Sequence, residues 1–492
     1  MKQFRQSLQR CASIILISAL FSCGKLSTQT VSNVDPVYYK SAVELTRAIR
    51  QGELTSSELL EIYLARIKRY NSAVNAVVAM DVAKARARAV QADKALARGE
   101  LWGPLHGLPM TVKDAFEVVG MPATAGDPEF RNHMPTQNAI AVQRLIDAGA
   151  IIFGKTNMPF HAKDLQTFNK VYGTTNNPWD LTRTPGGSSG GSATALAVGF
   201  TPLELGSDIA GSLRIPAHFT GIYAHKPTFG VVPRYGHFPP LPGKVTPRTM
   251  PGRPLFVAGP MARATDDLEL AMDILTSPGK SDMDVSRPQL LPGPQKPLQD
   301  FRVAVWFTDP YPEAEVDAQV MPVLLNTVNQ LRKAGVQVDE NARPGIDLRE
   351  SLMLFLDIYY QMAKLPLPRE LVMRQKKMQT RWAKFFESYD VLLAPVTPTA
   401  AFLHDQTQPK EARELMINGK PRSYIASNFA WTLMAVVSGL PATVAPVGLS
   451  GSGLPVGIQI IGANLEDRKT IAFAKELSKL VGGFVAPPAY EN

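Results

Sequence analysis

Apolar residues recur at helical spacing in the first hundred residues of the chain. Ser41-x-x-Glu44 and Thr55-x-x-Glu58 each precede such a pattern. A serine or threonine followed three residues later by glutamate is a capping box, which starts a helix. Residues 81–98 are rich in alanine and in alternating charges and stop at Gly99, which predicts a further helix.

Short apolar runs and helical patterns alternate from residue 104 onward, which predicts an α/β layered sheet rather than separate α and β domains. Strands are expected at residues 110–112, 150–153, 203–205, 301–305, 336–338 and 389–395. Helices are expected at residues 138–148 and 315–334 and over the region 350–388, and residues 277–300 are expected to form a surface excursion. We find no linker in this stretch, so residues 37–492 are predicted to form a single domain.

Composition and charge fit a globular protein without a nucleic-acid partner. Hydrophobic residues make up 45% of the 492 residues and charged residues 19%, and the formal net charge is +9. The basic residues are spread widely. Their one local cluster, at Arg374, Lys376 and Lys377, is interpreted as a solvated helix face. A nucleic-acid interface would need a basic stripe and a recognition motif, and the sequence has neither.

The N-terminus resembles an export signal. Lys2, Arg5 and Arg10 precede an apolar run at residues 11–22, which is too short to span a bilayer comfortably. We therefore expect residues 1–22 to be a signal peptide and residues 23–36 a tether. Export to the bacterial envelope, either the periplasm or the outer membrane, follows from this interpretation.

The residues around Cys23 resemble a bacterial lipoprotein box, Leu20-Phe21-Ser22-Cys23, although Phe21 is bulkier than that pattern prefers. A lipid anchor at Cys23 is therefore expected, and it would be the only membrane attachment. The alternatives are an ordinary cleaved signal peptide and a short uncleaved anchor. Since Cys11 is the only other cysteine, a chain that begins at Cys23 has no intramolecular disulfide, cysteine nucleophile or cysteine-bound metal.

Three small segments carry candidate chemistry, but each is ambiguous alone. Ser212 follows a predicted strand, where successive backbone N–H groups can converge on an anion, yet most such serines are loop or cap residues. The loop Gly186–Gly191 is equally typical of a flexible turn. Lys113, between Val112 and Phe116, is either a surface residue or a buried amine whose lowered pKa makes it a base. No Gly-x-Ser-x-Gly motif supplies a histidine-dependent alternative.

The order and spacing of these residues resemble the amidase signature family, which has a Ser–cis-Ser–Lys catalytic triad. Lys113 lies 75 residues before Ser188, and Ser188 lies 24 residues before Ser212. The resemblance runs from about residue 38 to 480 and includes four further segments: Gly103–Pro109, Gly154–Asn157, Lys226–Thr228 and Val456–Gln459. It implies a single α/β/α layered domain around a large mixed β-sheet.

By that resemblance Ser212 is the nucleophile, Ser188 the bridging serine after a cis Gly187–Ser188 bond, and Lys113 the base. The implied oxyanion hole consists of the backbone N–H groups of Ile209, Ala210, Gly211 and Ser212. Ser189, Asp208 and Arg214 match positions that support the triad, and no metal or other cofactor is implied. Ala210 departs from the family pattern, which commonly has glycine there.

The resemblance implies a serine amidohydrolase that cleaves amide-type C–N bonds of small, linear substrates and also accepts esters and carbamates. A second hypothesis is the A subunit of a tRNA-dependent amidotransferase, against which the leader argues. A third is a lipoprotein that binds a ligand without turnover, against which the intact triad argues. The protein is expected to be a monomer or a homodimer.

The acyl pocket is expected to be lined by residues 125–137, 160–172 and 352–386 and by Trp431. Five aromatic residues of the third segment suggest an apolar or aryl substrate: Phe355, Tyr359, Tyr360, Trp382 and Phe385. Alternatively, these five are core residues.

Overall fold

The computed structural model describes residues 36–237, 255–277, 288–362 and 366–491, and Pro36–Asn492 form one compact unit. The predicted signal peptide, Cys23 and all of the predicted tether except Pro36 lie outside the described residues. No helix in the described ranges is long and apolar enough to cross a membrane.

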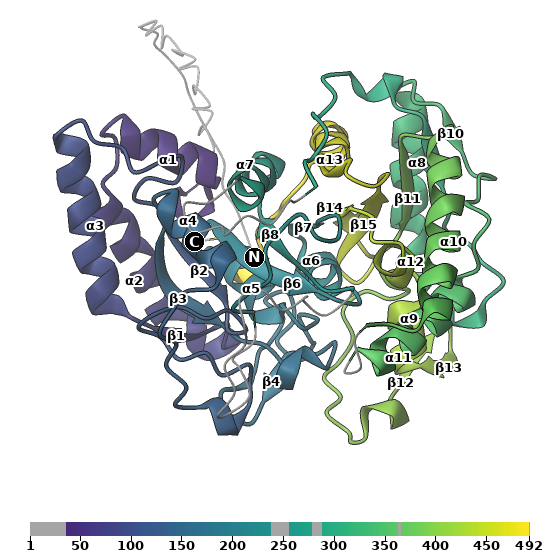
Figure 1. The fold of residues 1–492 in the computed structure, drawn as a ribbon, viewed down its shortest axis with the longest axis horizontal. Helices are drawn as coiled ribbons and strands as arrows, with labels where there is room; N and C mark the ends of the chain where they lie inside the picture. The colour runs from purple at the N-terminus through teal and green to yellow at the C-terminus, as the bar shows by residue number, and fades with distance from the viewer. Residues whose placement is uncertain (1–35, 238–254, 278–287, 363–365, 492) are drawn as a thin grey trace, which may run out of the picture. The chain divides into compact units, whose positions relative to one another are not determined.

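An eleven-stranded mixed sheet runs through this unit (Figure 1) in the order β1-β3-β2-β6-β8-β7-β14-β15-β11-β9-β10. The strands are β1 Val77–Met80, β2 Pro109–Lys113, β3 Ile151–Thr156, β6 Leu203–Asp208, β7 Tyr223–Lys226, β8 Val257–Ala262, β9 Val303–Val305, β10 Val338–Asp339, β11 Val391–Pro395, β14 Ala442–Leu449 and β15 Pro455–Ile461. Two small hairpins stand apart from it: β4 Phe168–Asn169 with β5 Gly173–Thr174, and β12 Glu414–Ile417 with β13 Lys420–Ser423. The predicted mixed α/β sheet is confirmed.

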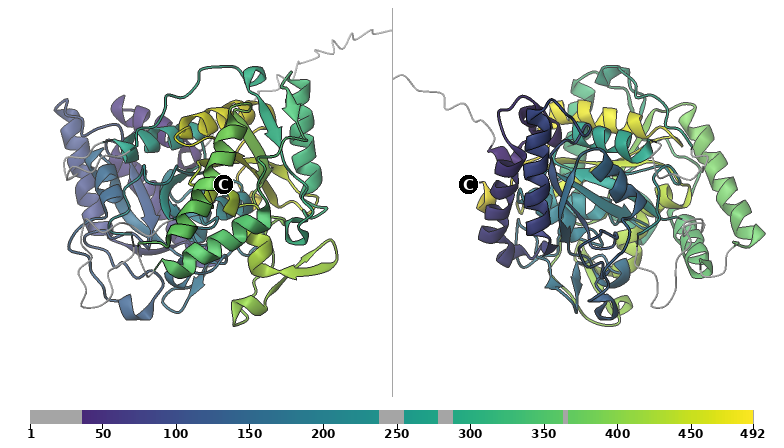
Figure 2. Two further views of the ribbon diagram at one scale, coloured as in Figure 1. Left: turned by 45° about the vertical axis from the view of Figure 1, so that its right-hand side comes forward. Right: turned by 60° about the vertical axis from the view of Figure 1, so that its left-hand side comes forward.

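Helices cover both faces of the sheet. The α-helices of the described residues are α1 Ala42–Arg50, α2 Ser56–Val74, α3 Val82–Ala97, α4 Ile140–Asp147, α5 Gly190–Ala197, α6 Arg214–Thr220, α7 Thr265–Thr276, α8 Met321–Lys333, α9 Leu348–Gln361, α10 Arg369–Phe386, α11 Tyr424–Ala430, α12 Leu433–Val437 and α13 Asp467–Val481. Met261 of β8 packs in an apolar cluster with α5 and α6, whereas its neighbour Ala262 packs in a second cluster with α7 and α13. Of the N-terminal helices, coloured purple and dark blue in Figure 2, α2 and α3 pack against each other near β2 and β3, and α1 contacts α7.

Both predicted capping boxes are present. Ser41 and Thr55 accept hydrogen bonds from the backbone N–H groups of Glu44 and Glu58, and each glutamate side chain accepts from its cap residue in return. The helical region expected at 350–388 consists of two helices, α9 and α10. The first ends before Pro366 and the second begins directly after Pro368. Proline lacks the N–H that a helix interior requires, which explains the interruption.

The sheet also fixes where chemistry can occur. β2 and β6 are adjacent parallel strands, with Thr111 opposite Glu204 and Val112 opposite Leu205. Their carboxyl ends, Lys113 and Asp208, therefore lie at the same edge of the sheet. In open α/β sheets this edge is where ligands bind.

Candidate active site

Lys113 is the last residue of β2, and its side chain is fully buried. Its Nζ lies 2.7 Å from the Oγ of Ser188, 3.1 Å from that of Ser189 and 3.0 Å from that of Ser207. The structure therefore brings Lys113 and Ser188 together as the sequence predicts. Ser207, the third hydroxyl, was not singled out from the sequence.

Burial lowers the pKa of Lys113 to about 7, although the negative charge of Asp208 and, when it is ionised, that of Glu204 oppose this shift. Desolvation disfavours the ammonium form. The neutral amine is consequently available near neutral pH, and a base with a pKa close to the working pH is effective.

We therefore expect kcat/KM to decline below about pH 7, because protonated Lys113 cannot accept a proton. The limiting loss from this group is about tenfold per pH unit, and kcat/KM reports the free enzyme. A pH profile from 5 to 9 on one amide substrate measures it. A profile that stays flat down to pH 5 would show that Lys113 is not the base.

The loop that carries Ser188 and Ser189 leads directly into α5, and the Gly187–Ser188 peptide bond is cis. This loop is buried rather than flexible. A Cβ added at Gly187 would lie 2.8 Å from the carbonyl oxygen of Asp164, and the Thr167 hydroxyl donates to the Gly186 carbonyl at 2.9 Å. Its glycines thus permit close packing against the segment 157–167.

Ser212 lies between β6 and α6, beside the loop of Ser188 and Ser189. The backbone N–H of Ser189 donates to the carbonyl oxygen of Ser212 at 3.2 Å. The Ser212 hydroxyl makes no hydrogen bond to any residue in the described ranges, so a Ser212–Ser188 link is not formed here. Catalytic hydrogen bonds of a free enzyme often tighten only when substrate binds.

Three of the four predicted oxyanion donors are free. Across the described ranges, the backbone N–H groups of Ile209, Ala210 and Ser212 have no hydrogen-bond partner. Ala210 and Ser212 are buried, and buried backbone N–H groups are nearly always paired. Such groups can stabilise a developing oxyanion. The N–H of Gly211 differs from the prediction, since it donates to Asp208 Oδ1 at 2.7 Å.

Asp208 and Arg214 form a fully buried ion pair beneath this turn. Arg214 Nε and Nη2 donate to Asp208 at 3.0 and 3.1 Å, and Nη1 donates to Thr432 O at 2.8 Å and Gln459 Oε1 at 3.0 Å. Burial opposes ionisation of Asp208, but the Arg214 guanidinium outweighs it and the pKa of that carboxyl lies below its usual value. The pair therefore fixes the Gly211 turn and ties α6 to β15.

Two neighbouring positions of the turn should respond in opposite ways to a single methyl group. Gly211 has φ +117°, and an added Cβ would lie 2.8 Å from Ile215 Cδ1 and 2.9 Å from Thr432 Cγ2. Gly211→Ala should therefore lower kcat/KM by about 100-fold or more or prevent folding, since the strained turn would displace the neighbouring N–H groups of Ala210 and Ser212.

Ala210 lies outside the left-handed region and is buried. Ala210→Gly should keep kcat/KM within about threefold, because the donor is backbone, and lower the free energy of unfolding by about 0.4–1 kcal/mol. Rates and denaturant unfolding of both variants measure this. A tenfold gain in Ala210→Gly would instead mean that the methyl narrows the acyl approach.

The remaining family segments serve mainly to hold the structure. Lys155 donates to the Phe116 carbonyl at 2.7 Å and pairs with Asp114 at 3.4 Å. Burial also lowers the pKa of Lys226 to about 7, and its Nζ donates to the Pro227 carbonyl at 2.9 Å. His106 accepts from the backbone N–H of Trp102 at 3.0 Å.

The aromatic residues expected at the acyl pocket are mostly core residues. Phe355, Trp382 and Phe385 are buried, as is Trp431, whose ring packs against Trp306 with centroids 5.8 Å apart. Tyr360 is exposed. The four buried residues belong to the main apolar cluster of the protein, as the core interpretation expects.

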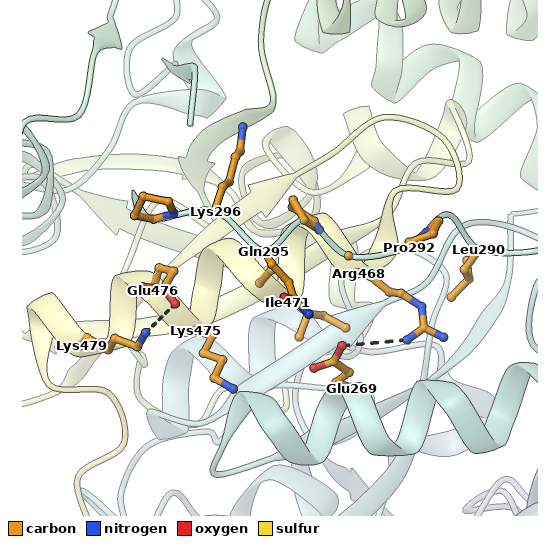
Figure 3. Close-up of a pocket in the computed structure, with 14 residues that line it drawn as sticks. Glu269, Leu290, Pro292, Gln295, Lys296, Arg468, Ile471, Lys475, Glu476 and Lys479 are labelled. Atoms are coloured by element: carbon orange, nitrogen blue, oxygen red, sulfur yellow. Dashed lines mark hydrogen bonds and ion pairs between the residues drawn. The ribbon is translucent and has the colours of Figure 1, made fainter. Parts of the chain in front are cut away.

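A cavity of about 890 Å³ lies away from these residues (Figure 3). It is bordered by α7, α13 and the segment 290–297, and contains none of Lys113, Ser188 and Ser212. Its charged side chains are paired, Arg468 with Glu269 at 3.9 Å and Lys479 with Glu476 at 2.5 Å.

Comparison with known proteins agrees with this geometry. The family model "Amidase" matches residues 58–366 and 358–471. The chain is 31% identical to fatty-acid amide hydrolase 2-A of Danio rerio, covering 92% of this chain and 91% of the relative. It is 31% identical to indoleacetamide hydrolase of Bradyrhizobium diazoefficiens, covering 91% and 87%.

A third relative is the A subunit of the glutamyl-tRNA(Gln) amidotransferase of Anaeromyxobacter, 32% identical over 88% of this chain and 95% of the relative. Among solved structures, an amidase crystal structure has a TM-score of 0.74 and 29% identity, covering 90% of this chain and all of that one.

Proposed function

This chain belongs to the amidase signature family and hydrolyses amide C–N bonds, and we propose that Ser212, Ser188 and Lys113 carry out the reaction. The observation that carries the proposal is the 2.7 Å contact of a fully buried lysine with Ser188. Serine is a poor nucleophile without an adjacent base. Lys113, acting through Ser188, is the base that the geometry offers.

The proposed first half-reaction moves one proton along this path. Ser212 Oγ attacks the amide carbonyl carbon while its proton passes to Ser188, and the Ser188 proton passes to the Lys113 amine. The carbonyl oxygen becomes an oxyanion and binds the free N–H groups of Ile209, Ala210 and Ser212. Lys113 then returns a proton through Ser188 to the leaving nitrogen, and the C–N bond breaks.

The second half-reaction uses the same groups in reverse order. Water attacks the ester formed on Ser212 while its proton passes through Ser188 to Lys113. The Ser212–acyl bond then breaks as that proton returns to the Ser212 oxygen. The carboxylic acid leaves and the enzyme is restored.

The proposed substrates are linear amides with an apolar or aryl acyl group. The names of the relatives support this, since they include a fatty-acid amide hydrolase, an indoleacetamide hydrolase and an acylamidase. The aromatic residues of 352–386 do not support it, because most of them are core residues. Substrate range therefore needs a direct measurement.

A substrate panel tests this function on the purified full-length protein. Anilides, primary fatty amides, aryl esters and carbamates are compared, and released amine or acid is measured. We expect turnover of the amides with apolar acyl groups and side activity on aryl esters. Failure to hydrolyse any amide would reject the substrate class.

The amidotransferase A subunit is the second candidate, favoured by the 32% identity to that relative. The same panel separates the two, with glutamine as an added substrate. Steady-state hydrolysis of apolar amides by the chain alone supports a free-standing amidase. Turnover of glutamine and of no other amide would support the second candidate.

We also propose export to the bacterial envelope and lipidation at Cys23, from the sequence of residues 1–23. Cys23→Ser should block processing, and globomycin should have the same effect on the wild-type protein. Unchanged processing in either case would exclude the lipid anchor. The body is proposed to be a monomer or a homodimer, which light scattering on the purified protein would determine.

A further inference from the structure

Lys113 has a second polar connection, which the acyl-transfer steps do not use. It runs from Lys113 Nζ to Ser207 Oγ at 3.0 Å, and from there to His237 Nε2 at 2.9 Å. Ser207 is buried, whereas His237 is partly exposed. The connection therefore joins the buried amine to an imidazole, the side-chain type whose unperturbed pKa lies closest to neutral pH.

The imidazole of His237 is held in place by its neighbours. Its ring packs edge-on against Phe116, with centroids 4.8 Å apart, and lies tilted against Phe256, with centroids 4.0 Å apart. The backbone of Gly236 accepts a hydrogen bond from the N–H of Glu117 at 2.8 Å. These contacts aim Nε2 at Ser207.

The directions of the hydrogen bonds around Lys113 decide whether the amine can act as a base. A neutral amine has two hydrogens and one lone pair, and three hydroxyls surround Nζ. The lone pair faces Ser188 only if both hydrogens are donated to Ser189 and Ser207. Each of these two hydroxyls must then direct its own hydrogen elsewhere.

The structure supplies both of the acceptors that this requires. The Ser189 hydroxyl donates to the Ser207 carbonyl oxygen at 3.3 Å. The Ser207 hydroxyl has His237 Nε2 at 2.9 Å, which accepts when the imidazole is neutral and carries its hydrogen on Nδ1. Both hydroxyls are then oriented to accept from Lys113.

We propose that neutral His237 is a positioning residue that, through Ser207, directs the lone pair of Lys113 toward Ser188. This inference rests on the proposed role of Lys113 as the base. Protonation of His237 reverses the contact. Nε2–H then donates to Ser207, whose hydrogen turns toward the Lys113 lone pair and competes with Ser188.

Other titratable and charged groups also lie near this chain of contacts. Those packed around it are Glu204 and Asp208 of β6, Asp114 with its partner Lys155, Glu117 with its partner His133, and Arg234. Burial raises the pKa of Glu204 to about 8, so it stays protonated below pH 7. Asp208 stays ionised beside Arg214.

The proposal predicts a two-proton acid limb. In the wild type, log kcat/KM should fall with a slope of 1 just below pH 7 and approach 2 once His237 is also protonated, at about 6.5 for an ordinary imidazole. His237→Gln keeps an acceptor at the Nε2 position but does not titrate. It should keep kcat/KM at pH 8 within about threefold and show a slope of 1 throughout.

His237→Phe is the matched variant, because it keeps the packing against Phe116 and Phe256 but offers no acceptor. We expect kcat/KM to fall by about tenfold or more at pH 8, with thermal unfolding unchanged. The inference is overturned if His237→Phe retains the wild-type rate and pH profile. It is also overturned if the wild-type slope is 1 down to pH 5.

Two further variants separate this inference from the proposed function. If Ser212→Ala or Lys113→Met keeps activity, the proposed function itself is wrong. If both are inactive while His237→Phe behaves as wild type, only the role of His237 is rejected.

Discussion

Replacement of Ser212 by alanine is expected to lower kcat/KM for amide hydrolysis by about 10⁴-fold or more. Within the part of the chain that the structure describes, Ser212 places a hydroxyl beside the Ser188 loop and next to the N–H groups of Ile209 and Ala210. Without it no acyl-enzyme forms, and only binding and the oxyanion donors contribute. Initial rates on an amide from the substrate panel, together with thermal unfolding, measure the effect.

Ser192→Ala is a suitable control for this experiment. Ser192 belongs to the same glycine–serine stretch, but its hydroxyl contacts Thr156 at 2.8 Å rather than Lys113. It should keep most of the activity and still react with a fluorophosphonate at Ser212. Labelling of a different serine in the wild type would contradict the assignment of the nucleophile.

Lys113→Met should remove activity and stabilise the fold at the same time. We expect kcat/KM to fall by about 10³-fold or more, because general-base catalysis is lost. The pKa of Lys113 is about 7 in the folded protein, against an ordinary 10.5. Between these two values the unfolded chain binds a proton that the folded chain does not, so folding must expel it.

Methionine has a similar length and no proton to lose, so the free energy of unfolding should rise by about 1–4 kcal/mol at pH 7.5. Urea unfolding of both proteins measures this. Wild-type stability should also increase from pH 7 toward pH 10 by a term that Lys113→Met lacks. An active variant, or one that is less stable than the wild type, would contradict the burial argument.

Local signals in the sequence predict much of the fold. The two capping boxes and the strand predicted at residues 110–112 depend on neighbouring residues only, and the structure confirms them, with the strand one residue longer at each end. The break between α9 and α10 also has a local cause in Pro366 and Pro368, but the dense apolar pattern on either side obscured it. Sheet order depends on contacts between distant segments, which no local pattern contains.

In the candidate site, too, some features could be predicted from the sequence and others depend on contacts between distant segments. Motif spacing identified Lys113, Ser188 and Ser212, because the family pattern is specific. The engagement of Gly211 by Asp208 and the approach of His237 to Ser207 depend on three-dimensional packing. His237 belongs to none of the family segments, and the only available signal was Ser207, which directly precedes Asp208.

The segment 157–167 is attached to the catalytic loop at both of its ends. At one end, the backbone of Asn157 lies so close to Gly191 that a Cβ on Gly191 would overlap it. At the other end, residues 164–167 contact Gly186 and Gly187. The intervening residues, including the half-exposed Phe160, have no such attachment to this loop. During divergence or laboratory evolution, the sequence between these anchors can therefore vary while the serines keep their positions.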